Sequence, residues 1–68
     1  MSTKEILDVL IQDETDAAER FAYHADAADD GETHAALSEH AHARAQIAEM
    51  LADGRLRVVA SASTEAGA

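Results

Sequence analysis

The chain has 68 residues, no cysteine and no proline, and its 14 acidic residues against five basic ones give a formal net charge of −9. This charge argues against binding to nucleic acid or to anionic membranes, because both need clustered lysine and arginine. The missing cysteines exclude disulfides and thiolate metal sites. With no apolar run near ~20 residues and no signal-peptide pattern, the chain is predicted to be soluble and cytoplasmic. A domain this short buries only about 60% of its unfolded surface, so self-association or a bound metal is expected to stabilise it.

The first predicted element is a helix over about residues 3–29. The four residues Ser2-Thr3-Lys4-Glu5 match a capping box, in which the serine caps the helix and the glutamate reaches back to it. Apolar residues then recur at helical spacing, at Leu7, Leu10, Ile11, Ala18, Phe21, Ala25 and Ala28. One face of this helix is therefore expected to pack against a partner.

The second predicted element is a helix over about residues 32–52. Gly31 is expected to end the first helix in a left-handed conformation, and Asp30 or Thr33 to cap the second. The apolar residues again follow the helical period, at Ala36, Leu37, Ala41, Ile47, Ala48 and Leu51. Gly54 is expected to stop this helix.

The last residues predict no further helix. The segment 55–60, Arg-Leu-Arg-Val-Val-Ala, alternates as a short strand does. One strand has no partner within the chain, so we expect either pairing with the same segment of a second copy or an extended arm over a neighbouring helix. The small, polar residues 61–68 are typical of a disordered tail.

Residues 1–54 therefore predict an all-α fold, an antiparallel two-helix hairpin, because two long helices with a short connection pack antiparallel. A single hairpin leaves half of its apolar surface open. A second hairpin would close a four-helix bundle, so we expect a homodimer or a larger even oligomer.

Glu14 and Arg44 are charged residues near the centres of the two apolar stripes. Around a turn near residue 31, position i faces about position 62−i, which places Glu14 one helical turn from Arg44. We therefore expect an ion pair between them, buried inside the four-helix bundle. Such pairs seldom add net stability over apolar replacements, but they can fix register and partner choice.

A metal site is the alternative use of the same region. Glu14 from two subunits, with His40, would supply carboxylate and imidazole ligands at a dimer axis, although Arg44 would repel the cation. Glu39 and His42 have the Glu-x-x-His spacing of helical di-iron sites. They lie on the side of the helix away from the apolar stripe, which favours a solvated face.

Tyr23 points away from the apolar stripe, near Asp16, Glu19 and Arg20. This placement is typical of an ordinary exposed tyrosine, with a protein-partner surface as the alternative. The sequence has no nucleophile–base arrangement, no glycine-rich phosphate loop and no HExxH motif, so catalytic residues and cofactors are not expected.

Several motifs together match one known group of proteins: Leu7-x-x-Leu10-Ile11, then Phe21, then Glu32 opening the second helix, then Glu39-x-Ala41-x-x-Arg44-Ala45-Gln46-Ile47-Ala48-x-x-Leu51. With them, the chain resembles the ferritin-like superfamily, and most of all the first hairpin of rubrerythrin-related ferritin-like domains of unknown function. Those relatives usually carry two hairpins in one chain. A homodimer would restore their four-helix bundle, as in the short encapsulated ferritins.

The resemblance also bears on metal ligands. In metal-binding members the first helix gives a glutamate about seven residues before an aromatic, as Glu14 and Phe21 stand here, and the second gives Glu-x-x-His. In the same register those two positions are Arg44 and Ile47, neither of which is such a ligand. The resemblance therefore implies the fold but not the ferroxidase site. In a shifted register, Glu39 and His42 would be the motif.

The leading prediction is a non-catalytic, ferritin-like helical-hairpin protein that forms a homo-oligomer. The alternative is a protein that binds iron or another divalent metal at a subunit interface, which as an enzyme would be a ferroxidase-type di-metal protein. A third is an acidic adaptor whose surface or 55–60 arm binds another protein.

Overall fold

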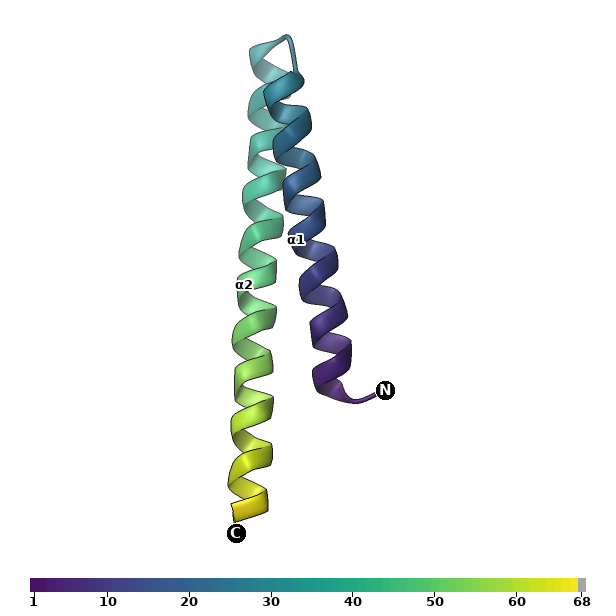
Figure 1. Cartoon of the computed structure of the whole chain (residues 1–68). Coiled ribbons are helices and arrows are strands. Elements are labelled where there is room, and N and C mark those ends of the chain that lie inside the picture. Colours follow the sequence, from purple (N-terminus) through teal and green to yellow (C-terminus); the bar gives the residue numbers. More distant parts are fainter. Residues whose placement is uncertain (68) are drawn as a thin grey trace.

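The computed structural model describes the backbone of residues 1–67 and the side chains of residues 1–60, and it consists of two antiparallel helices (Figure 1). Helix α1 spans Thr3–Ala27 and helix α2 spans Gly31–Gly67. No strand occurs among the described residues. The predicted all-α helical hairpin is thereby confirmed. At 37 residues α2 is longer than α1, which has 25, and Figure 1 shows its C-terminal part extending past the start of α1.

Both helices begin at the capping residues that the sequence predicts. Ser2 Oγ accepts a hydrogen bond from the Glu5 backbone N–H at 3.2 Å. Asp30 Oδ2 accepts one from the Thr33 backbone N–H at 2.9 Å. Each bond satisfies one of the N–H groups that have no partner in the first turn of a helix.

The turn between the helices differs from the prediction. α1 ends at Ala27, and Ala28 follows with an extended backbone, its N–H donating to the Ala25 carbonyl. Gly31 is the first residue of α2, and no described residue has a positive φ angle. The prediction of a left-handed Gly31 is therefore wrong, because the extended step at Ala28 already redirects the chain.

The second helix does not stop at Gly54. α2 continues through this residue and through 55–60, so the predicted helix end near residue 52 and the extended arm are both wrong. Glycine in a helix interior costs only about 1 kcal/mol. Helical continuation brings Arg55 to α1, where its Nη1 donates to Asp8 Oδ1 at 3.0 Å.

Beyond that contact, Arg57 also pairs with Asp53 one helical turn earlier, as i and i+4 neighbours do on a helix. The backbone of residues 61–67, predicted to be a disordered tail, is described as part of α2. Ala68 lies outside the described residues, and so do the side chains from 61 onward.

The hairpin is a plate one helix thick. Its extents are 58 × 17 × 11 Å, and its radius of gyration is 16.2 Å, against about 11 Å for a compact domain of this length. Among the described side chains only that of Ala25 is buried. The apolar residues along the contact between the helices are half-buried: Leu7, Ile11, Ala18, Phe21, Leu37, Ala41, Ala48, Leu51 and Val58. No second layer covers them, although domains are built from at least two layers.

Candidate functional site

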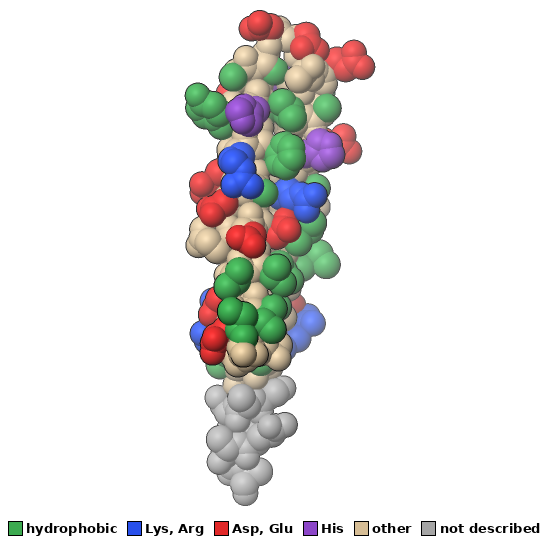
Figure 2. All heavy atoms as spheres, turned by 90° about the vertical axis from the view of Figure 1, so that its right-hand side faces the viewer, with side chains coloured by type: hydrophobic (Ala, Val, Ile, Leu, Met, Phe, Trp, Pro, Cys, Tyr) green, Lys and Arg blue, Asp and Glu red, His purple; other side chains and the backbone are tan. Residues whose placement is uncertain are grey.

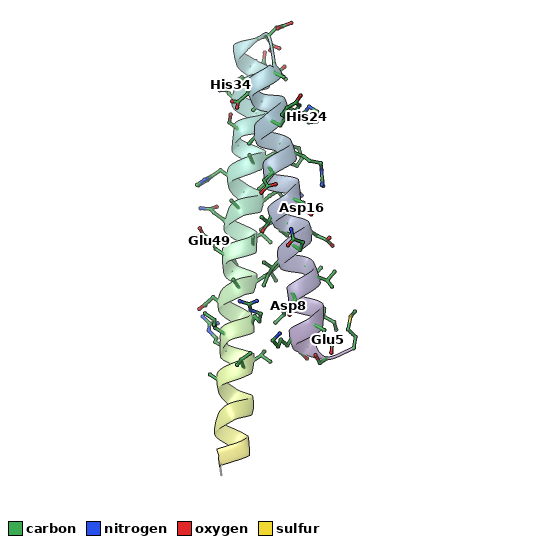
Figure 3. The ribbon with its side chains drawn as sticks, in the orientation of Figure 1. Glu5, Asp8, Asp16, His24, His34 and Glu49 are labelled. Atoms are coloured by element: carbon green, nitrogen blue, oxygen red, sulfur yellow. The ribbon has the colours of Figure 1, made fainter. Side chains whose placement is uncertain are left out.

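Four hydrogen bonds or ring contacts among the described residues connect α1 to α2 along the length of the hairpin. From the turn outward they join Ala25 with His34, Phe21 with His40, Glu14 with Arg44, and Asp8 with Arg55. Figure 3 shows His34 near the turn and Asp8 near the opposite end. All four keep the predicted register, in which position i faces about position 62−i, to within one helical turn.

The ion pair between Glu14 and Arg44 is present in the single hairpin. Arg44 Nη1 donates to Glu14 Oε2 at 3.3 Å. The side chain of Glu14 is 22% exposed and that of Arg44 is 43% exposed, so the pair is only half-buried. The predicted burial is absent from the single chain, because burial needs a second layer over the plate. A pair exposed to this degree contributes about 0–1 kcal/mol.

Close to this pair, His40 stacks on Phe21, with ring centroids 5.4 Å apart and an interplanar angle of 27°. The contact fixes which sides of the two helices lie on the same flank of the hairpin. On a helical wheel, Glu14 lies within about 20° of Phe21. Glu14 and His40, the two residues considered as metal ligands at a dimer axis, are therefore on one flank.

That flank also carries bulky apolar residues. Ile6 and Leu10 lie within about 60° of Phe21 on α1, whereas Ile47, Leu51 and Val58 lie within about 20° of His40 on α2. We call this surface the open face, and it consists of Ile6, Leu10, Phe21, Ile47, Leu51 and Val58. Three of its members are exposed, Ile6 at 44%, Leu10 at 40% and Ile47 at 36%.

The open face is not uniform along its length. Figure 2, which views the hairpin from the α1 side, shows hydrophobic side chains clustered on the half away from the turn and histidines nearer the turn. The sequence explains this distribution, since the corresponding positions toward the turn are Ala17, Ala36 and Ala43. The Glu14–Arg44 pair lies between the bulky half and the alanine half.

The opposite flank is held by polar contacts. Asp8 accepts hydrogen bonds from Lys4 Nζ and Arg55 Nη1, each at 3.0 Å. Both bonds lower the pKa of Asp8 below its ordinary value of 3.8, and the bond from Lys4 has the larger effect. Near the turn, His34 Nδ1 lies 2.7 Å from the Ala25 carbonyl oxygen, so this ring nitrogen carries the proton and donates it.

The other residues considered as metal ligands do not join the open face. Glu39 and His42 are exposed on the side of α2 away from α1. Within the part of the chain that the structure describes, no group of three or more His, Asp or Glu side chains is placed to hold a metal ion. Any metal site on the open face would therefore need ligands from two chains.

Tyr23 lies on the outer side of α1, where it is 71% exposed. Its ring meets that of His24 edge to face, with centroids 5.4 Å apart. Asp16, Glu19 and Arg20 line the same shallow recess, and Figure 3 shows Asp16 and His24 on this helix. Because a single helix supplies all of these side chains, the recess has no facing wall.

The contacts of Asp8 with Arg55 and of Ala25 with His34 were not predicted from the sequence. The register that predicted the ion pair places residue 54 opposite Asp8, one position from Arg55, and so indicates the first of these contacts. Arg55 was excluded because Gly54 was expected to end the helix before it.

Comparisons with protein-family models, curated proteins and solved structures give no significant match for this chain. Neither helix, over its described residues, is long and apolar enough to cross a membrane.

Proposed function

We propose that this chain is a non-catalytic assembly protein, a ferritin-like helical hairpin that pairs with a second copy to form a four-helix bundle. The observation that carries the proposal is the open face. Bulky residues such as Ile6, Leu10 and Ile47 are exposed there, while Ala25 is the only described residue that is buried. Exposed apolar clusters of this kind mark interaction sites.

The size of the hairpin suits this partner. A stable interface buries about 800 Å² per partner, which is about one sixth of the 4992 Å² accessible surface of the chain. The two helices lie side by side over the length of α1, roughly 37 Å at 1.5 Å per residue, and this two-helix surface is the part that a second copy can cover. A second copy presents the same apolar surface, and two plates face to face make the two layers that a helical core needs.

The chemistry of the open face also favours packing over catalysis. Its members are aliphatic side chains and one phenylalanine, and the charged groups beside them, Glu14 and Arg44, already pair with each other. An apolar centre with few charges is the composition of protein interface cores.

A matched pair of variants tests the proposal. Leu10 and Val9 are neighbours, exposed at 40% and 49% in the single hairpin. Leu10 lies about 20° from Phe21 on the helical wheel and Val9 about 120° from it, outside the open face. Leu10→Glu should dissociate the dimer in sedimentation velocity, whereas Val9→Glu should leave the mass unchanged. A wild-type chain that is a well-folded monomer would overturn the proposal, and so would equal effects of the two variants.

Metal binding is the second proposal, and one observation favours it. Glu14 and His40 lie on the same flank, so two chains placed face to face would present carboxylates and imidazoles from both copies to one interface, the ligand types that suit a divalent metal such as iron. His40 stacks on Phe21, which is seven residues or about 10 Å along α1 from Glu14, so the two ligand types lie at different levels within one chain. Arg44 opposes this use, since it already binds Glu14. Elemental analysis of the purified protein, with and without added Fe(II), tests it. Stoichiometric metal that is lost in Glu14→Ala would support it, and its absence in the wild-type chain would remove it.

A further inference from the structure

The charged pair on the open face distinguishes two ways in which a second copy can dock. Two plates packed face to face are related by a two-fold axis that lies between them, and this axis runs either along the helices or across them. An axis along the helices places both turns at the same end. An axis across the helices places the turns at opposite ends.

The two arrangements bring different helices into contact. With the turns at opposite ends, α1 lies over the partner's α1, and α2 lies over the partner's α2. With the turns at the same end, each α1 lies over the partner's α2. The second arrangement alternates the two kinds of helix around the bundle, whereas in both arrangements every neighbouring pair is antiparallel.

We infer that the second copy docks with its turn at the same end, so that Glu14 and Arg44 of both copies form a ring of four alternating charges. This inference rests on the proposed dimer and adds its orientation. Both side chains remain partly exposed after pairing within one chain, at 22% and 43%. Each therefore has surface left to meet the opposite charge on the second copy.

The opposite arrangement is disfavoured by the same pair. An axis across the helices at the level of the pair would set Glu14 over the partner copy's equivalent glutamate, and Arg44 over the equivalent arginine. Like charges placed face to face in an interface act against that pairing. The ring of alternating charges, in contrast, gives each charge two opposite neighbours as water is removed.

The sizes of the side chains agree with the same orientation. The bulky half of the open face, with Ile6, Leu10 and Val58, lies away from the turn, and the alanine half lies toward it. In Figure 1 the two ribbons separate toward the start of α1, so the hairpin widens where its side chains are large. Docking with the turns at the same end sets the wide end over the wide end. It also brings together the apolar residues that the single chain leaves exposed.

A distance between the two turns tests this orientation. The chain has no cysteine, so Asp29→Cys, in the turn, takes one spin label per chain. Double electron–electron resonance should give a label separation of about 20–30 Å if the turns share an end, since neighbouring helix axes lie about 10 Å apart. Turns at opposite ends would add the length of α1, which is roughly 37 Å at 1.5 Å per residue.

A control label at Gln46→Cys, halfway along α2, should give similar separations in both arrangements and reports that the labelled dimer is intact. A short turn-to-turn distance supports the inference. A long one overturns the orientation and leaves the dimer standing. A monomeric mass for the unlabelled wild-type chain overturns the dimer itself, so the two failures are distinguishable.

Discussion

Arg44 Nη1 lies 3.3 Å from Glu14 Oε2, a hydrogen bond that joins two residues 30 positions apart and ties the helices together at mid-length. The contribution of this bond to stability depends on whether water reaches the two side chains. In a lone hairpin, water reaches both side chains, and such a pair contributes about 0–1 kcal/mol. Under a second hairpin both charges lose water, and removing one partner then costs about 3–5 kcal/mol.

We therefore expect a single substitution to lower the stability of the dimer and a double substitution to restore most of it. Glu14→Leu should lower the free energy of unfolding of the dimer by about 3–5 kcal/mol, because Arg44 is left charged and unpaired in the interface. Adding Arg44→Met should restore most of the loss, since apolar side chains can replace a buried pair. Chemical denaturation at a fixed protein concentration measures both. A silent single variant would show that no second copy covers Arg44.

The continuity of α2 can be tested at Leu56, which is 61% exposed and lies in the segment expected to be an extended arm. Leu56→Pro should lower the free energy of unfolding by about 3 kcal/mol and reduce the circular dichroism at 222 nm, because proline interrupts a helix interior. Leu56→Ala is the control, and it should preserve the helix. An extended arm would tolerate proline, so equal stability of the two variants would contradict a helix through this position.

Short-range sequence patterns predicted much of the fold. The caps at Ser2 and Asp30 were found because each involves residues three positions apart. The contact of Glu14 with Arg44 followed from helical periodicity and a short turn, which together fix the register of an antiparallel pair.

Non-local effects explain what the sequence did not reveal. Gly54 resembles a helix stop, and the alternation after it resembles a strand, yet a contact from Arg55 to Asp8 on the other helix accompanies a continuous α2. The expected burial of Glu14 and Arg44 belongs to the four-helix bundle, and in the single hairpin both side chains stay partly exposed because no second layer covers them.

Salt should strengthen self-association. Each chain has a net charge of −9, so a dimer brings two strongly acidic bodies together. The screening length falls from about 30 Å at 0.01 M salt to about 3 Å at 1 M, which weakens this repulsion while leaving apolar contacts in place. Sedimentation equilibrium across a salt series should therefore give a falling dissociation constant. A constant that rises with salt would show that ion pairs, and not the apolar open face, hold the copies together.

Acid should destabilise the fold through Asp8 and Asp30. Hydrogen bonds from Lys4 and then Arg55 lower the pKa of Asp8, and a hydrogen bond from the Thr33 backbone N–H lowers that of Asp30, both from an ordinary value of 3.8. The folded chain thus binds these protons less readily than the unfolded chain. Their stabilisation is present above pH 3.8 and is lost as the pH falls through the lower folded pKa.

A variant at the second cap isolates this effect. Asp30→Asn retains a side-chain oxygen that can cap α2 but removes the titrating group. Thermal unfolding followed from pH 7 down to pH 2 should show a smaller acid loss in this variant than in the wild-type chain. Identical pH profiles would mean that Asp30 has the same pKa in the folded and unfolded chains.

The mass of the protein in solution, measured by light scattering across a dilution series with helicity monitored in parallel, tests the central claim most directly. Assembly through the open face predicts a helical species of about twice the 7.2 kDa mass of one chain. A helical, cooperatively folding species at 7.2 kDa would contradict it.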